Sequence, residues 1–351
     1  MQDGYLKGRG AQVNTRNKFL SQEYVTDHIE GLDEEKHLEA PKTEIFFEHP
    51  KKIVNKVDSP DLGMVYSLNP YQGCEHGCIY CYARNVHEYW GFSAGLDFER
   101  KIIVKENAPR TLEQQILHKS WKPMPIMVSG NTDCYQPLER RFKLTRGVLE
   151  VMVRYRHPVS MITKNVLVLR DIDLLTDLAS DNLVHIHFSI TTLDEKLRSI
   201  MEPRTASAIR KLKAIEALSK KGVPVSIMNA PIIPGLNHHE IPNVIKAAAD
   251  HGALSAGYTV VRLNGAIGPM FEDWLKKNFP DRFNKVWNQI CDMHGGQVND
   301  SEWGRRQSGE GNYANSIASL FRMAKKKYMS GRKVPPLDIT KFRRGGNLSL
   351  F

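Results

Sequence analysis

Residues 69–84 read Asn69-Pro-Tyr-Gln-Gly-Cys74-Glu-His-Gly-Cys78-Ile-Tyr-Cys81-Tyr-Ala-Arg84, which places three cysteines within eight positions. The whole chain has five cysteines, an odd number. An odd count argues against a disulfide framework and favours metal or redox chemistry. Thiolates are soft ligands that select zinc, iron–sulfur clusters or copper(I). We therefore expect a metal centre in this loop.

The spacing of the three cysteines, C-x-x-x-C-x-x-C, helps to choose among these metals. Structural zinc usually has four ligands in C-x-x-C pairs, and no matching second pair follows downstream. Three thiolates can instead hold three irons of a four-iron cube and leave the fourth iron open. We expect Cys74, Cys78 and Cys81 to hold such a [4Fe–4S] cluster. A zinc site, or three buried core thiols, is the alternative.

Short β-rich runs alternate with amphipathic helical runs in the rest of the chain. The expected strands are 63–69, 125–130, 159–165, 184–191, 223–232 and 256–264, and helices are expected near 81–90, 139–155, 170–179, 206–220 and 239–250. Six strands alternating with helices predict a parallel α/β sheet with right-handed crossovers. The apolar strands indicate burial on both faces, as in a barrel or partial barrel. Function gathers at the carboxyl ends of such strands, and the cysteines follow the first strand.

Length and composition indicate how the chain is organised. Its 351 residues, 41% hydrophobic and 25% charged, are typical of a globular protein. No apolar run approaches the roughly 18–20 residues of a membrane span, and the first residues lack the apolar core of a secretory signal. We expect a cytoplasmic protein. Its expected parts are an N-terminal extension that wraps the core (1–60), a core (61–268), a helical region (269–330) and a basic tail ending in Leu-Ser-Leu-Phe (331–351).

The pattern C-x-x-x-C-x-aromatic-C after a first strand resembles the motif of the radical S-adenosylmethionine superfamily, with Tyr80 in the place of the adenine-contacting aromatic residue. NPYQGCEHGCIYCYAR, followed by TDCYQP, SITTLDEKLRSIMEPRT and PIIPGLN, resembles the branch that includes spore photoproduct lyase, and within it a bacterial group of unassigned function. The resemblance extends from about Gly8 to the C-terminus. It implies a (β/α)6 partial barrel, a [4Fe–4S] cluster and S-adenosyl-L-methionine.

The same resemblance implies where S-adenosylmethionine would bind. The loop after the second strand, with Gly130, Asn131, Thr132 and Asp133, would present backbone groups to the methionine amine, although an ordinary polar turn is the alternative. Ser189 and Thr191, at the end of the fourth strand, would face the ribose or the carboxylate. The remaining candidates are Glu202 and Arg204, which a surface ion pair would also explain, and Asn229 and Arg262, which could simply shape the barrel opening.

Cys134 and Tyr135 follow the second-strand loop, where they could face the cavity. A thiol backed by a tyrosine can donate hydrogen to a substrate radical, and spore photoproduct lyase works in that style. We therefore consider both as catalytic candidates. A non-ligand cysteine is more often a small buried hydrophobic residue, which is the alternative for Cys134.

The net charge of +10 is concentrated near the C-terminus. Between Phe321 and Gly346, nine Lys or Arg face one acid, Asp338. This stretch could hold a polyanion such as DNA, or it could be a solvated basic tail. The last residues resemble the short peptide by which bacterial polymerases and repair proteins hold the replication sliding clamp, through Leu348, Leu350 and Phe351. The alternative is a terminal strand that folds back onto its own domain.

Together these features predict a radical S-adenosylmethionine enzyme that generates a 5′-deoxyadenosyl radical. We favour nucleic acid as the substrate, in a lyase-like or DNA-repair-like reaction. Such an enzyme needs an electron donor such as flavodoxin or ferredoxin. One alternative is radical modification of a protein or small metabolite. The other is an interaction module that binds a cluster or zinc without turnover.

Overall fold

The computed structural model describes residues 5–20 and 42–345. In this part of the chain the larger sheet has seven strands in the order β10-β9-β8-β7-β6-β3-β2. Its parallel strands are β3 (Tyr66–Leu68), β6 (Ile126–Val128), β7 (Val159–Thr163), β8 (Val184–Ser189), β9 (Val225–Ile232) and β10 (Ser255–Val260). The antiparallel edge strand is β2 (Val54–Lys56). All six predicted strands are confirmed.

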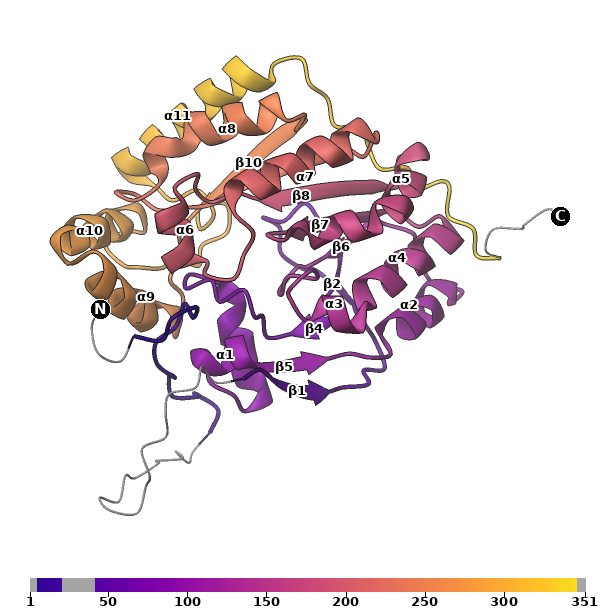
Figure 1. Cartoon of the computed structure of the whole chain (residues 1–351), viewed down its shortest axis with the longest axis horizontal. Helices are drawn as coiled ribbons and strands as arrows, with labels where there is room; N and C mark the ends of the chain where they lie inside the picture. The colour runs from indigo at the N-terminus through magenta and orange to yellow at the C-terminus, as the bar shows by residue number, and fades with distance from the viewer. Residues whose placement is uncertain (1–4, 21–41, 346–351) are drawn as a thin grey trace.

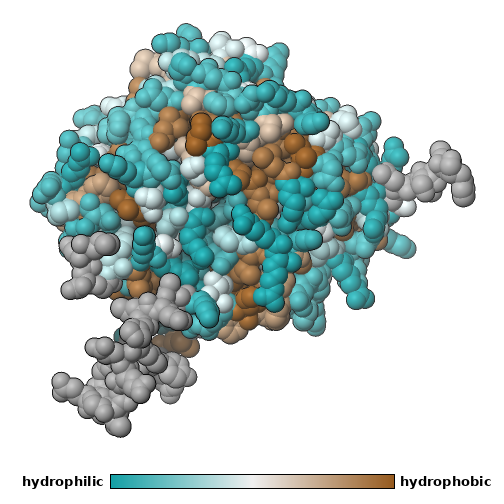
Figure 2. All heavy atoms as spheres, viewed as in Figure 1, coloured by the Kyte–Doolittle hydropathy of each residue, from teal (hydrophilic) through white to brown (hydrophobic). Residues whose placement is uncertain are grey.

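Helices cover the outer face of this sheet (Figure 1). They include α4 (Leu144–Tyr155), α5 (Ile172–Ser180), α7 (Ala208–Lys220) and α8 (Ile241–Asp250). Each helix buries one stripe of residues. In α4, for example, Val148, Met152 and Tyr155 recur every three or four positions and enter the main core. The opposite stripes are hydrophilic, and Figure 2 shows that apolar residues reach this face of the molecule in patches between hydrophilic ones. The fold is the expected α/β partial barrel.

A second, smaller sheet lies below the cysteine loop (Figure 1). It consists of β1 (Glu44–Phe47), β5 (Lys101–Val104) and β4 (Tyr71–Gln72), in the order β1-β5-β4. The short helices η1 (Tyr82–Trp90) and α1 (Leu96–Arg100) connect the loop to β5, and the Cys74 amide donates to the Phe98 carbonyl at 2.9 Å. The sequence patterns do not predict this sheet.

The remaining helices complete the chain in the described residues. They are α2 (Ala108–Leu117), α3 (Glu139–Phe142), η2 (Val166–Asp171), α6 (Glu195–Met201), η3 (His238–Glu240), α9 (Ile267–Asn278), η4 (Pro280–Arg282), α10 (Phe283–Met293) and α11 (Gly311–Met329). α11 packs beside α8, and the loop before it borders β10, where the Val260 amide donates to the Gln307 carbonyl at 2.9 Å. None of the described helices is long and apolar enough to cross a membrane.

The segment after α11 crosses the amino ends of the parallel strands. The Asp338 amide donates to the carbonyl of Asn182, just before β8, and the Arg343 amide donates to the carbonyl of Tyr155, just before β7, both at 2.9 Å. In Figure 1 this yellow segment passes α5 on its way to the C-terminus. The basic tail therefore lies at the end of the barrel opposite to the carboxyl ends of the strands.

Candidate active site at the carboxyl ends of the strands

The three cysteines lie in the loop between β4 and η1, at the carboxyl end of β3. Cys74 and Cys78 are buried and Cys81 is partly buried, and the Cys81 amide donates to the Cys78 carbonyl at 3.3 Å. Burial, followed by the nearby charges of Asp133 and Cys78, raises the pKa of Cys74 well above its usual range. Burial also raises the pKa values of Cys78 and Cys81. Three such thiols in one loop become thiolates only if a bound cation compensates the negative charge.

The three thiols fit a [4Fe–4S] cluster. In residues 5–20 and 42–345, no three His, Cys, Asp or Glu side chains converge on a position for a single metal ion. A cluster does not require such convergence, because each cysteine binds a different iron. The loop also contains positive-φ Gly73 and Gly77, where the backbone turns tightly.

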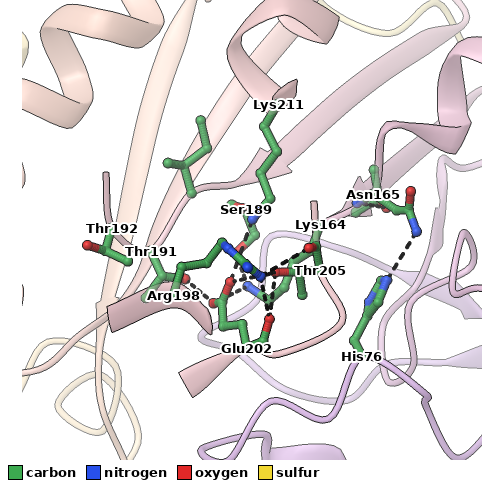
Figure 3. Close-up of polar contacts among 12 residues, drawn as sticks. His76, Lys164, Asn165, Ser189, Thr191, Thr192, Arg198, Glu202, Thr205 and Lys211 are labelled. Carbon is green, nitrogen blue, oxygen red and sulfur yellow. Dashed lines mark hydrogen bonds and ion pairs between the residues drawn. The ribbon is translucent and has the colours of Figure 1, made fainter. Parts of the chain in front are cut away.

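A buried carboxylate, Glu202, lies at the end of α6 beside this loop (Figure 3). Its Oε1 accepts hydrogen bonds from the hydroxyls of Tyr80 and Thr191 and lies 3.4 Å from the Nζ of Lys164. Its Oε2 lies 3.6 Å from the Nζ of Lys211. Burial alone would raise the pKa of Glu202, but the two ammonium groups lower it to about 2. Glu202 is therefore ionised at neutral pH.

Lys164 and Lys211 were not among the residues that the sequence indicated. Lys164 directly follows β7 and donates to the Ser189 hydroxyl, and Lys211 on α7 donates to the Ser189 carbonyl at 3.1 Å (Figure 3). Despite burial, Glu202 and Cys78 raise the pKa of Lys164, whereas burial lowers the pKa of Lys211. With both lysines charged, two ammonium groups face Glu202, and the Asp133 carboxylate also lies within electrostatic range of Lys164. The two ammonium groups favour a thiolate or the carboxylate of a ligand nearby.

A sequence signal for both lysines does exist. Lys164 occupies the carboxyl end of a predicted strand, where functional groups gather in parallel α/β folds. Lys211 shares the buried face of α7 with Ala208, Leu212 and Ile215, an apolar stripe on which a charged residue is unusual.

Asp133 joins the second-strand loop to the loop of the cysteines. Its carboxylate accepts hydrogen bonds from the Thr163 hydroxyl and the Lys164 amide, both at 2.7 Å, and lies 3.3 Å from the Nδ1 of His76. Although burial would raise the pKa of Asp133, His76 lowers it. Asp133 thus holds the carboxyl end of β7 against His76, which lies between Cys74 and Cys78 in the motif.

The rest of the second-strand loop is also bound within the chain. The amides of Asn131 and Thr132 donate to the Asn69 side chain at 2.8 and 3.4 Å, and the Thr132 hydroxyl donates to the Tyr71 carbonyl at 2.7 Å. The Gly130 carbonyl accepts from the Tyr82 hydroxyl. The loop is next to the cysteines, as expected, but its contact with S-adenosylmethionine stays a prediction.

The other three candidates differ in position. The side-chain Nδ2 of Asn229 donates to the carbonyls of Ile190 and Thr191. Its buried Oδ1 accepts no hydrogen bond from the described residues. Arg204 forms an ion pair of 3.6 Å with Glu75, inside the cysteine loop. Arg262 is half-buried; burial and then the charge of Arg306 lower its pKa. Asn229 thus borders the Glu202 group, whereas Arg262 lies near Arg306 and near Tyr82, which follows the last cysteine of the motif.

Cys134 and Tyr135 are fully buried in the main hydrophobic core. The Cys134 amide donates to the Ser129 hydroxyl at 2.8 Å, and the Tyr135 hydroxyl donates to Asp171 at 3.1 Å. Burial, followed by the charge of Asp133, raises the pKa of the Cys134 thiol. These contacts are those of packed core residues, and we assign neither residue to the Glu202 group. A role as hydrogen donor stays a prediction.

Comparison with known proteins identifies the family. Residues 68–248, which contain the cysteine loop and the Glu202 group, match the model of the radical SAM superfamily. The chain belongs to this superfamily. The radical SAM family implies a [4Fe–4S] cluster and S-adenosylmethionine. Cys74, Cys78 and Cys81, which fit a cluster, lie inside the matched segment.

Relatives of this radical SAM protein are uncharacterised. A protein of Mycobacterium tuberculosis (strain ATCC 25618 / H37Rv) is 30% identical over 234 residues, 66% of this chain and 69% of the relative. A protein of Methanocaldococcus jannaschii is 29% identical over 250 residues, 71% of this chain and 89% of the relative. The names of these relatives provide no substrate.

Solved structures support the fold of the radical SAM chain. Spore photoproduct lyase complexed with dinucleoside spore photoproduct has a TM-score of 0.61 and 15% identity, covering 87% of this chain and 86% of the lyase. A mutant of that enzyme with bound AdoMet and dinucleoside spore photoproduct has a TM-score of 0.59 and 14% identity, covering 82% and 79%. At this level of identity, the likeness establishes the fold alone.

Proposed function

We propose that this radical SAM protein is an enzyme that acts on nucleic acid through a lyase-like or repair-like reaction. The observation that carries the catalytic part is the buried Glu202 group, which lies at the carboxyl ends of the strands beside two buried cysteines and one partly buried cysteine. When bound, the cluster and S-adenosylmethionine supply a 5′-deoxyadenosyl radical that can abstract hydrogen from a substrate.

In this proposal, some residues of the site bind the cluster and others bind S-adenosylmethionine. Cys74, Cys78 and Cys81 hold the cluster. The Glu202 carboxylate accepts hydrogen bonds from the Tyr80 hydroxyl and, in the proposal, from the amine or hydroxyls of S-adenosylmethionine. Lys164 provides the positive charge for the ligand carboxylate. Burial of these groups excludes water, which strengthens each charged contact.

Exposed aromatic side chains support a nucleic-acid substrate. Tyr82, 50% exposed, donates to the Gly130 carbonyl and so lies at the barrel opening. Trp303, 55% exposed, has the Arg306 guanidinium 4.0 Å from its ring centroid. Exposed aromatic faces are typical of surfaces that stack unpaired bases. Arg306 is itself paired with Asp61, so it supports the Trp303 ring and is not counted as a phosphate ligand. The structural neighbour binds a dinucleoside photoproduct, which favours the same substrate class here.

The basic tail has a different place in this proposal. It lies at the amino ends of β7 and β8, away from the cysteines, so it would tether the enzyme to DNA and would not hold the reacting nucleotide. The sliding-clamp residues Leu348, Leu350 and Phe351 lie outside the described residues, and their role stays a prediction. A flavodoxin or ferredoxin as electron donor and a cytoplasmic location belong to the same proposal.

The experiment that tests the function is product analysis. Protein reconstituted with iron and sulfide under anaerobic conditions is reduced and incubated with S-adenosylmethionine and either single-stranded, duplex or ultraviolet-irradiated DNA. We expect at least one DNA to change its nucleoside masses and to increase 5′-deoxyadenosine. If the nucleoside masses stay unchanged and the amount of 5′-deoxyadenosine does not depend on DNA, nucleic acid is excluded as the substrate. A protein or metabolite substrate would then be favoured.

A further inference from the structure

The carboxylate of Glu99 joins two segments that are far apart in the sequence. Glu99 lies in α1 and is fully buried. It accepts hydrogen bonds from the amides of Gly10 and Ala11 at 3.2 and 2.8 Å, and it forms an ion pair of 2.5 Å with Arg84. The Arg9 guanidinium adds a hydrogen bond of 2.9 Å to the Glu99 carbonyl. Residues 9–11 are thus fixed to the core through one residue: Glu99 binds Gly10 and Ala11 with its carboxylate and Arg9 with its carbonyl.

Arg84 carries this connection to a cysteine. Its guanidinium is fully buried, and its Nε donates to the Cys78 carbonyl at 2.9 Å. Its Nη1 donates to the carbonyls of Ala94 and Gly95 at 3.2 and 3.0 Å. Because Glu99 compensates the charge and four contacts satisfy the donors, Arg84 has one fixed orientation. Arg84 therefore holds the backbone carbonyl of Cys78 in place.

The N-terminal segment also contacts the cysteine loop directly. A Cβ atom on Gly10 would lie 1.8 Å from the Gly77 carbonyl oxygen and 3.2 Å from the Ile79 amide. Gly77 has a φ of +68°, and a Cβ atom there would lie 2.8 Å from the Glu99 carboxylate. A side chain at position 10 would overlap the Gly77 backbone, and one at position 77 would overlap the Glu99 carboxylate. Residue 10 therefore packs directly against the backbone on either side of Cys78.

We propose that residues 9–11 are part of the cluster site and act, through Glu99 and Arg84, as a clamp on the Cys78 backbone. Glu99 and Arg84 are positioning residues, since they contact a ligand's backbone and not the cluster. The clamp fixes the direction of the Cys78 ligand and covers the loop against water and oxygen. Such outer contacts tune the stability and potential of iron–sulfur centres. The proposal rests on the cluster that the family carries and is independent of the substrate.

The decisive variant is Gly10→Ala, because the added methyl group overlaps the Gly77 carbonyl and should lift the segment off the loop. Gly63→Ala is the matched control, since a Cβ atom there meets nothing within 4 Å. Each full-length protein is reconstituted anaerobically. Iron per chain, the electron paramagnetic resonance spectrum of the reduced cluster, and the half-life of its visible absorbance in air are then measured.

We expect Gly10→Ala to shorten the half-life of the cluster in air by about tenfold and to change its resonance spectrum. Tenfold is about the lower end of the effect of losing an outer contact to a metal ligand. Glu99→Gln should have the same effect, and Glu99→Asp should recover part of it. Equal iron content, spectrum and half-life in Gly10→Ala, Gly63→Ala and the unmodified protein would overturn the proposal. If Glu99→Gln does not fold, Gly10→Ala alone decides, because it removes no buried charge. DNA is absent from this assay, so failure of the substrate proposal cannot affect it.

Discussion

The Nζ of Lys164 lies 3.4 Å from Glu202 Oε1, and the Nζ of Lys211 lies 3.6 Å from the other oxygen of the same carboxylate. Lys164 comes from the end of β7, Lys211 from α7 and Glu202 from the end of α6 (Figure 3). Three elements thus place one acid and two cations beside the cysteines. Buried charges remain in proteins where they are paired. A cluster of charges with shifted pKa values at the mouth of a fold is a candidate functional site.

Replacement of Glu202 should weaken the binding of S-adenosylmethionine. Glu202→Gln keeps the shape but removes the charge, so we expect an increase in Kd of about tenfold to a hundredfold, as for the loss of one charge-assisted hydrogen bond. Titration calorimetry of the reconstituted protein measures this change. Glu216→Gln, on α7, is the control, because Glu216 forms an exposed ion pair with Lys220 and touches no residue of the Glu202 group. Equal Kd values for both variants would remove Glu202 from the ligand site.

The depressed pKa of Glu202 also predicts a dependence of stability on pH. Its pKa is lowered from 4.5 to about 2 in the folded chain, so the stabilisation is complete above about pH 4.5 and is lost as the pH falls toward 2. The difference amounts to about 3 kcal/mol. Urea unfolding of the metal-free protein between pH 5 and 3 should show a smaller loss of stability for Glu202→Gln than for the unmodified chain. Parallel pH profiles would contradict the shift.

Only three of the five cysteines should be needed for the cluster. We expect Cys74→Ala, Cys78→Ala and Cys81→Ala each to lose the brown colour and the bound iron after reconstitution. Cys291→Ala should keep both, because Cys291 lies on α10. Iron analysis of the purified variants decides the matter, and a normal iron content in any of the first three would remove that residue from the site.

Cys134→Ala should distinguish a core residue from a hydrogen donor. Because the side chain is packed in the main core, we expect a modest loss of stability with unchanged products. Mass spectrometry of the nucleosides and calorimetric melting measure the two effects. Altered or abortive products, together with normal release of 5′-deoxyadenosine, would instead show that Cys134 quenches a substrate radical.

Trp303 should contribute to the binding of single-stranded DNA. We expect Trp303→Ala to increase the Kd by about five- to a hundredfold, the effect of one lost base-stacking contact. Fluorescence anisotropy with a labelled oligonucleotide at fixed salt concentration measures it. Tyr313→Ala is the control, since Tyr313 is 43% exposed on α11. A similar Kd for the two variants would argue against the proposed aromatic surface.

Much of the barrel could be predicted because its strands are apolar runs that end in turn residues. The smaller sheet could not be predicted, since β4 has only two residues and β1 pairs with β5, which lies more than 50 positions later. Tyr80, Thr191 and Glu202 were indicated by the family resemblance, and the structure brings them together. Their two lysine partners were missed, because no motif or spacing marks them: Lys164 is indicated only by its place at a strand end and Lys211 only by its place on an apolar helix stripe.

The central claim is that the three cysteines hold a cluster with which the protein cleaves S-adenosylmethionine. The most direct test is to quantify 5′-deoxyadenosine after anaerobic reconstitution, reduction with dithionite and addition of S-adenosylmethionine. The account predicts that a brown protein releases 5′-deoxyadenosine only when reduced, and that Cys78→Ala releases none. A fully iron-loaded protein that releases no 5′-deoxyadenosine, or a colourless protein that holds one zinc ion, would contradict it.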